Sequence, residues 1–325
     1  MTGAGLFVGL DQVKVLSEKV GLEFRDNIRI PPDLSLVRRM YFDPPTEDAP
    51  GPQAFLVEMP GPCTNMAHFH EIDQFQLFFG GNSSWYKRHA LPPLTVHYSD
   101  AYSTYGPFGS SSEETFRFLT LRPVRSVVAG YMPWARKMLE RQGRLTHRRR
   151  RNFSVELTLD TSVSDGGSVE RTVIEPEADG LAAKAISLAP GVSFDGPARD
   201  ERSAGRYYYV ARGSIENEGT VVGAGSVGWL GSDDLVPVLT AASGGCDLVV
   251  LDFPSRDFTF RPRTWMSYSA NKPKGFREHK KSMGFPARSF PVNSIATTPT
   301  PHCSPSITAS RTTPDHENRP RCLQS

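Results

Sequence analysis

The sequence predicts an all-β protein organised in two domains. Gly (28) and Pro (27) are abundant among the 325 residues, and the hydrophobic runs are short and separated by turn residues. Short runs at close intervals are typical of β-sandwiches and small barrels rather than of helical proteins. Two domains suit this length better than one, because single cores rarely grow beyond about 250–300 residues.

Changes in composition divide the chain into four segments. The first segment begins with an N-terminal extension, whose hydrophobic spacing fits a short helix and an edge strand equally well. The third segment again reads as a series of strands, and the fourth is rich in Pro, Ser and Thr, so we expect a disordered tail there. The segments are a first domain at 1–131, a linker at 132–152, a second domain at 153–270 and the tail at 271–325.

The linker combines a helical pattern with a basic run. Trp134, Met138 and Leu139 have the spacing of one helical face, which predicts a short connecting helix. The four arginines Arg148–Arg151 fit either a nucleic-acid patch or a solvated linker. No aromatic residues interleave with them and the formal net charge of the chain is only +2, so we expect a solvated linker and no nucleic-acid partner.

Cysteine usage and hydropathy predict a soluble, cytoplasmic protein. The four cysteines, Cys63, Cys246, Cys303 and Cys322, form no C-x-x-C pair, which favours free thiols in a reducing compartment. The sequence shows no N-terminal signal pattern and no run near the roughly 20 apolar residues that a spanning helix needs. We therefore expect no membrane partner.

The stretch GPCTNMAHFHEIDQFQLFFGG, residues 61–81, contains the strongest chemical signal. His68 and His70 are two residues apart, so on a β-strand their imidazoles point to the same face, where they can share a metal ion. Gln74 begins the next strand-like run and can lie close to both. Nearby aromatic residues fit either a pocket lining or a barrel core, and we expect core. These are Trp85, Tyr86, Tyr98, Tyr102 and Tyr105.

This spacing resembles the first signature of the cupin superfamily, G-x5-H-x-H-x3-E-x6-G. His68 and His70 supply the H-x-H, Gln74 stands where the family has Glu, and six residues lead to Gly81; the leading Gly61 is one residue early. The resemblance implies a jelly-roll barrel with a metal site. Because Gln74 is neutral, we expect weaker metal binding than with the family carboxylate.

The second family signature, P-x-G-x2-H, is matched only at its start. Pro107-Phe108-Gly109 is followed by Ser110, Ser111 and Ser112, so the third histidine is missing. His97, on the predicted strand LTVHYSDAY, is an alternative donor, and Asp100 has the position of a structural turn residue.

A second, diverged copy of the motif follows. In RYYYVARG, Arg206 precedes Gly213 by the same spacing that separates Gln74 from Gly81. The chain thus resembles a bicupin, with two cupin-like β-barrel domains. No histidine lies between His147 and His279, so the second barrel is degenerate as a metal site, and packing against the first barrel or binding a partner molecule is its expected role.

The resemblance implies two alternative functions. One is a metal-dependent dioxygenase, isomerase or cyclase, holding Fe or Mn rather than Zn through His68, His70, Gln74 and His97, and acting on a small oxygenated or aromatic molecule. The other is a metal-free small-molecule binding or assembly protein that keeps the barrel pocket without catalysis. Family members often pair their sheets edge to edge, which implies a homodimer.

Overall fold

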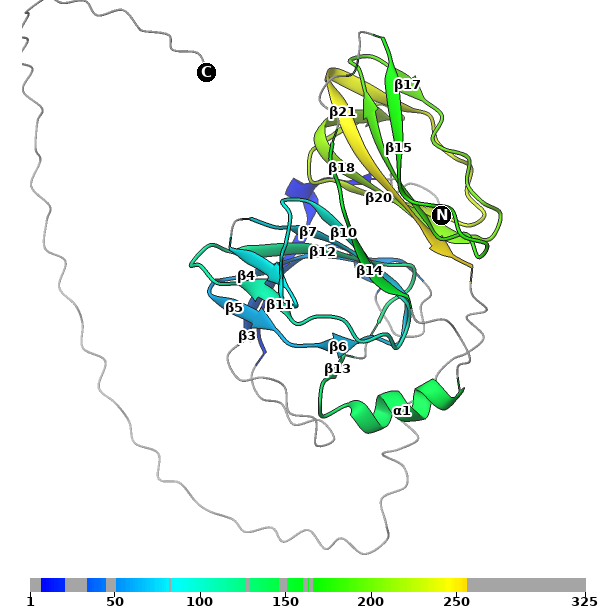
Figure 1. Cartoon of the computed structure of the whole chain (residues 1–325). Coiled ribbons are helices and arrows are strands. Elements are labelled where there is room, and N and C mark those ends of the chain that lie inside the picture. Colours follow the sequence, from blue (N-terminus) through cyan, green and yellow to red (C-terminus); the bar gives the residue numbers. More distant parts are fainter. Residues whose placement is uncertain are drawn as a thin grey trace, which may run out of the picture. The chain divides into compact units, whose positions relative to one another are not determined.

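The computed structural model describes residues 7–20, 34–44, 51–81, 83–126, 129–145, 151–159, 163 and 166–255. Antiparallel strands dominate these residues, together with the short helix α1 (Arg136–Leu145), which confirms the all-β prediction (Figure 1). The chain separates into a unit at Met1–Arg261 and a unit at Pro262–Ser325. The tail predicted at 271–325 lies outside the described residues.

The first lobe contains thirteen of the described strands. They are β2 (Lys14–Val20), β3 (Leu34–Phe42), β4 (Gln53–Met59), β5 (Cys63–Asn65), β6 (His68–Phe69), β7 (Gln74–Phe79), β8 (Ser84–Tyr86), β9 (His89–Ala90), β10 (Thr95–Ser99), β11 (Phe108–Ser110), β12 (Phe116–Arg122), β13 (Gly130–Tyr131) and β14 (Asn152–Glu156). They form a seven-stranded sheet in the order β14-β10-β7-β12-β4-β3-β2, a four-stranded sheet in the order β5-β11-β8-β9 and the pair β13-β6.

The second lobe is one eight-stranded sheet. Its strands are β1 (Phe7–Val8), β15 (Ser168–Ile174), β16 (Ala182–Leu188), β17 (Ser193–Phe194), β18 (Ser203–Asn217), β19 (Thr220–Gly223), β20 (Val227–Gly231) and β21 (Leu239–Pro254). The order is β1-β20-β18-β21-β16-β15, with β17 paired to β21 and β19 paired to β18.

The two lobes exchange strands. The 3-10 turn η1 (Leu10–Gln12) separates β1, which pairs with β20 of the second lobe, from β2, which joins the first. In the other direction β14, which follows the linker in sequence, pairs with β10 of the first lobe. The N-terminal strand β1 thus belongs to the second lobe, and β14, which follows the linker, belongs to the first.

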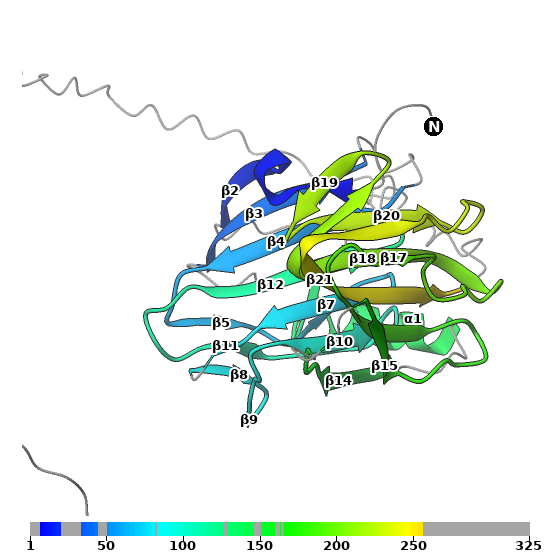
Figure 2. The same ribbon diagram turned by 90° about the horizontal axis from the view of Figure 1, so that it is seen from above.

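The seven-stranded sheet separates the two main cores. Side chains alternate along β7, so Phe75 and Leu77 face the second lobe while Gln74, Gln76 and Phe78 face the interior of the first. Every residue from Gln74 to Phe78 is buried, as expected when a sheet is covered on both faces. Figure 2 looks down on this stack, with β18 and β21 over β7 and β12.

Aromatic contacts join the lobes. The rings of Phe75 and Phe253 meet edge to face with centroids 4.9 Å apart. Tyr207 of the second lobe donates its hydroxyl proton to the backbone carbonyl of Arg122 in the first lobe, at 2.9 Å. The second lobe therefore packs directly against the sheet that carries the candidate site.

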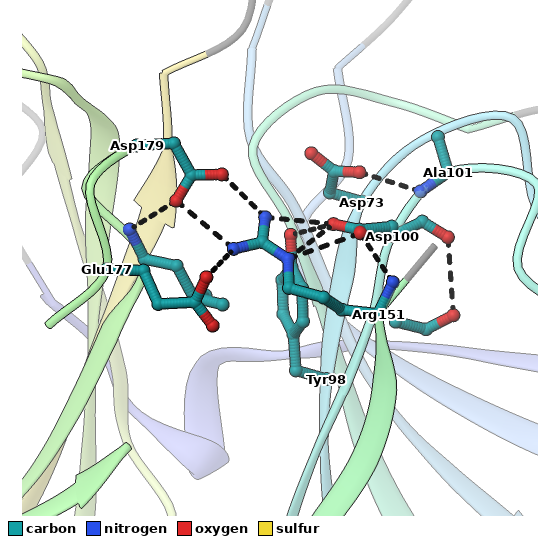
Figure 3. A network of polar contacts seen from close by, with 9 residues as sticks. Asp73, Tyr98, Asp100, Ala101, Arg151, Glu177 and Asp179 are labelled. Atoms are coloured by element: carbon teal, nitrogen blue, oxygen red, sulfur yellow. Dashed lines mark hydrogen bonds and ion pairs between the residues drawn. The ribbon is translucent and has the colours of Figure 1, made fainter. Parts of the chain in front are cut away.

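Arg151 forms an ion-pair cluster that ties the linker to both lobes (Figure 3). Its Nη2 lies 3.1 Å from Asp100 Oδ1 and 2.7 Å from Asp179 Oδ2, and its Nη1 lies 2.8 Å from Glu177 Oε2. The Arg151 side chain is only 10% exposed, so this member of the basic run is not solvated; Arg148–Arg150 lie outside the described residues.

The linker helix packs beneath the first lobe. Met138 and Leu139 of α1 contact a small cluster that contains Phe69 and Ala135. Trp134 was expected on this face, but it precedes the helix and is 40% exposed, and Ala135 takes the buried place. Within the described ranges, no helix is long and apolar enough to cross a bilayer.

Candidate functional site

Strand pairing gathers polar side chains inside the first lobe. Gln76 of β7 pairs with His97 of β10 on one side and with Thr120 of β12 on the other, so all three lie on the inner face. Gln74 and Arg122 lie two residues further along the same strands and on the same face. An aromatic group that includes Phe78, Phe108 and Phe118 packs beside them.

His68 uses both of its ring nitrogens. Its Nδ1 lies 2.6 Å from the Met66 carbonyl oxygen, which can only accept, so Nδ1 carries the proton. Its Nε2 then accepts a hydrogen bond from the Tyr105 hydroxyl at 2.6 Å. Burial, followed by the charge of Arg122, lowers the pKa of His68 to about 4, so the imidazole is neutral at neutral pH.

Arg122 is the charged centre of this interior. Arg122 is only 5% exposed. Its Nε and Nη2 donate hydrogen bonds to Gln74 Oε1 at 3.2 and 3.1 Å. Its Nη1 donates to Gln53 Oε1 at 2.8 Å. Burial lowers the pKa of Arg122 to about 10, which still leaves the guanidinium protonated at neutral pH.

A chain of hydrogen bonds leads from Arg122 to a carboxylate. Arg122 Nη2 donates to His70 Nε2 at 3.1 Å, because a guanidinium has no acceptor. The proton of His70 is thereby placed on Nδ1, which lies 3.3 Å from Ser126 Oγ, and Ser126 donates to Glu71 Oε2 at 2.9 Å. His70 and Glu71 are only partly buried, so the chain runs from the interior toward solvent.

The predicted metal ligands come together, but they do not fit a metal ion. The rings of His68 and His70 lie 5.3 Å apart, yet Tyr105 occupies the free lone pair of His68 and Arg122 occupies that of His70. Gln74 Oε1 already accepts two N–H groups from Arg122. In the described part of the chain, no group of three or more His, Cys, Asp or Glu residues is placed to hold a metal ion. A permanent cation beside these atoms also repels a divalent one.

His97 faces the same interior from β10. Its Nδ1 lies 2.9 Å from Ser154 Oγ, and its ring packs against Tyr86 and Tyr105 with centroids 5.1 and 5.4 Å away. Its Nε2 has no hydrogen-bond partner. Burial lowers the pKa of His97 to about 3, with smaller contributions from Lys87 and His68.

Two glutamine atoms in this interior are also without partners. Gln76 Oε1 and Gln74 Nε2 are buried and make no hydrogen bond of normal geometry. Gln74 does lie near the Tyr105 hydroxyl: burial raises the pKa of Tyr105, and Gln74 lowers it by a smaller amount. Buried polar groups normally find a partner, so such a cluster marks a place where water or a ligand binds.

The serines that replace the third family histidine form their own cluster. Ser112 Oγ lies 2.7 Å from Ser83 Oγ and 3.3 Å from Ser110 Oγ. These hydroxyl groups satisfy one another and connect the end of β11 to the loop before β8.

Two residues of the site, Arg122 and Gln53, were missed by the sequence patterns, and the role of a third, Tyr105, was predicted only in part. Arg122 and Gln53 carry no motif; the only available signal is that Arg122 continues the parity of Phe116, Phe118 and Thr120 toward the interior. Tyr105 was expected as core, and it is buried as expected, but its hydroxyl also bonds to His68.

An open pocket of about 290 Å³ lies elsewhere, in the second lobe. Arg212 and Asp247, which line it, pair with each other at 2.5 Å. Cys246 also lines it, and burial raises the pKa of its thiol to about 12, which makes a thiolate scarce at neutral pH. The unpartnered atoms of Gln74, Gln76 and His97 are in the first lobe and do not line this pocket.

Comparison with known proteins identifies the fold. No family model and no curated protein matches the chain. A candidate dioxygenase from Nostoc punctiforme is 11% identical, and the match covers 77% of this chain and 82% of that one with a TM-score of 0.51. Two further structures match at lower TM-scores. They are a pirin from Escherichia coli in complex with nickel(II) (10% identity, 77% and 99% covered, TM-score 0.46) and a cupin 2 conserved barrel protein from Leptotrichia buccalis (10%, 67% and 88%, 0.39).

The chain shares its fold with the Nostoc protein, and its two β lobes agree with the two cupin-like domains that the sequence predicted. His68 and His70, the histidines of the motif from which the sequence predicted this fold, lie beside Arg122. The guanidinium of Arg122 donates hydrogen bonds to Gln74 and to His70 there.

Proposed function

We propose that this bicupin is a metal-independent binding protein, which holds a small molecule in the interior of its first lobe around Arg122. One observation supports this more than any other. The atoms that would bind the metal, His70 Nε2 and Gln74 Oε1, accept hydrogen bonds from Arg122 instead. A fixed cation with neutral neighbours can attract and orient a polar ligand without a metal.

The surrounding residues suit a binding site. Gln76 and His97 each have a buried polar atom without a hydrogen-bond partner. A ligand that forms these hydrogen bonds is thereby bound more tightly. The aromatic side chains of Phe78 and Phe108 contribute apolar contact area next to them. His70, half-buried and hydrogen-bonded to Arg122, lies on the solvent side.

Metal analysis of the purified full-length protein separates this function from a metal-dependent enzyme of dioxygenase, isomerase or cyclase type. We expect no near-stoichiometric Fe or Mn, and no rise in melting temperature when Mn(II) is added. A stoichiometric metal that is lost in the double variant His68→Ala, His70→Ala would contradict the proposal.

Arg122→Met tests the role of the cation directly. In the presence of EDTA, ligand-observed NMR with a panel of anionic, neutral and cationic small molecules should detect binding to the wild type, and that binding should weaken at least tenfold in Arg122→Met. Arg117→Met is the matched control, because Arg117 lies on the same strand but its side chain is 55% exposed. Equal binding by all three proteins would place the ligand elsewhere.

A further inference from the structure

The two lobes place a polar pair at equivalent positions. Gln74 and Arg206 each lie seven residues before a glycine, Gly81 and Gly213, on β7 and β18. Across the sheet, Arg206 pairs with Asp252 of β21, and Gln74 lies opposite Arg122 of β12, next to the pair Phe75 and Leu121. Gln74 is therefore equivalent to Arg206, and Arg122 to Asp252.

In the second lobe this pair, Arg206 and Asp252, is a buried ion pair with no net charge. Arg206 is fully buried, and its Nε and Nη2 donate to the two carboxylate oxygens of Asp252 at 2.8 and 2.9 Å. This bidentate arrangement is the one that a guanidinium prefers. Each buried charge has its counter-charge, which is what makes burial of both tolerable.

In the first lobe the arginine of the pair, Arg122, is on β12, the strand equivalent to the one that carries Asp252, and its partner Gln74 is neutral. Arg122 directs the same two atoms, Nε and Nη2, at the single amide oxygen of Gln74. Among the described residues, the hydrogen-bond partners of the Arg122 side chain are the neutral groups of Gln74, Gln53 and His70. The Glu71 carboxylate is linked to it through Ser126 and His70, and it is near enough to raise the pKa of Arg122 against the larger effect of burial. In the first lobe, the position that the Asp252 carboxylate takes against Arg206 in the second lobe is thus taken by the neutral amide of Gln74.

The spare polar atoms lie beside this missing charge. Gln74 Nε2 makes no hydrogen bond of normal geometry, although Tyr105 lies near it, and the neighbouring guanidinium can only donate. A neutral ligand can accept hydrogen bonds from these donors, but only an anion would also place a negative charge against the guanidinium, as Asp252 does in the second lobe.

We propose that the first lobe binds a small carboxylate, whose two oxygens accept from Nε and Nη2 of Arg122 as the Asp252 carboxylate does from Arg206. The Gln74 side chain turns aside and donates through its Nε2 to the bound anion. This inference rests on the proposed binding function and adds the chemical class of the ligand. Acetate and glycolate are suitable probes, since each has one carboxylate and little else.

The test compares carboxylates with their neutral amides. The melting temperature of the full-length protein is measured in EDTA with acetate or glycolate, and with acetamide or glycolamide, at constant ionic strength set with sodium chloride. We expect a concentration-dependent rise with the carboxylates only. An equal rise with the amides, or with sodium chloride alone, overturns the inference.

Gln74→Glu supplies the missing charge from within the chain. Its carboxylate should pair with Arg122 as Asp252 pairs with Arg206, and we expect the acetate-dependent rise to disappear while the variant stays folded. Gln53→Glu places a carboxylate on Nη1 of the same guanidinium and should weaken the response likewise, which keeps the test valid if the first variant fails to fold. Gln12→Glu adds the same charge at an exposed position and should leave the response unchanged.

The outcomes separate this inference from the function on which it rests. If neutral molecules bind in an Arg122-dependent way and carboxylates do not, the proposed binding function is supported and the proposal of a carboxylate ligand is wrong. If no compound binds at any charge, both fall. An acetate response that persists unchanged in folded Gln74→Glu and Gln53→Glu overturns the anion site at Arg122.

Discussion

Arg122 and the histidines around it show how burial fixes protonation states. The guanidinium stays charged because its pKa, about 10 after burial, remains above neutral pH, whereas burial holds His68 and His97 neutral with pKa values of about 4 and 3. The imidazoles can accept hydrogen bonds only in this neutral form. The site is thus one cation among neutral acceptors and donors.

These lowered pKa values predict an acid-sensitive fold. In the unfolded chain an imidazole titrates near 6.5, so between pH 6.5 and the folded pKa values the unfolded chain binds protons that the folded chain does not. The free energy of unfolding should therefore fall as the pH falls, by about 2 kcal/mol for each of the two histidines between pH 7 and pH 5. Urea unfolding at a series of pH values measures this.

A pair of histidine variants identifies the source of the acid sensitivity. His97→Gln should reduce the loss of stability between pH 7 and pH 5 by about half, since one of the two buried imidazoles is gone. His89→Gln is the control, because His89 is exposed on β9. An unchanged pH dependence in His97→Gln would show that the acid sensitivity arises elsewhere.

The two faces of strand β7 pack into different cores, one between the lobes and one inside the first lobe. Phe75 packs against Phe253 in the core between the lobes, and Phe78 packs against Phe108 and the ring of His97 inside the first lobe. The element as a whole is buried, so its hydrophobicity alone does not reveal which face binds a ligand.

Alanine substitutions on the two faces of β7 should separate stability from binding. Phe75→Ala and Phe78→Ala should each lower the free energy of unfolding by about 3–5 kcal/mol, as is usual for fully buried phenylalanine. Only Phe78→Ala should also weaken acetate binding, which NMR titration measures. Equal loss of binding in both variants would contradict the separation of the two faces.

The two lobes are held together by exchanged strands, an aromatic core and the Arg151 cluster. Asp100, whose side chain is 1% exposed, depends on Arg151 for its counter-charge, and Figure 3 shows the guanidinium reaching Asp179 and Glu177 of the second lobe. The basic linker therefore acts as a structural joint. A homodimer and a cytoplasmic location stay predictions at this scale.

Arg151→Gln should destabilise the protein by about 3–5 kcal/mol, chiefly because it removes the guanidinium that pairs with the buried Asp100 carboxylate. Urea unfolding followed by the fluorescence of Trp85 in the first lobe and Trp229 in the second reports whether the lobes separate. Lys184→Gln removes a more exposed ion pair, with Glu170, and should cost less than about 1 kcal/mol. Equal effects of the two substitutions would show that the cluster is not a joint.

The sequence by itself determined the all-β class with two cupin-like units, because short alternating runs and the spacing from His68 to Gly81 are local properties of the chain. The site around His68 and His70 stays a prediction. Only the tertiary structure decided what fills that place. Arg122 lies 48 residues from Gln74 in sequence, and pairing of β7 with β12 brings them together. A contact of that kind depends on register between distant strands, which no local pattern encodes.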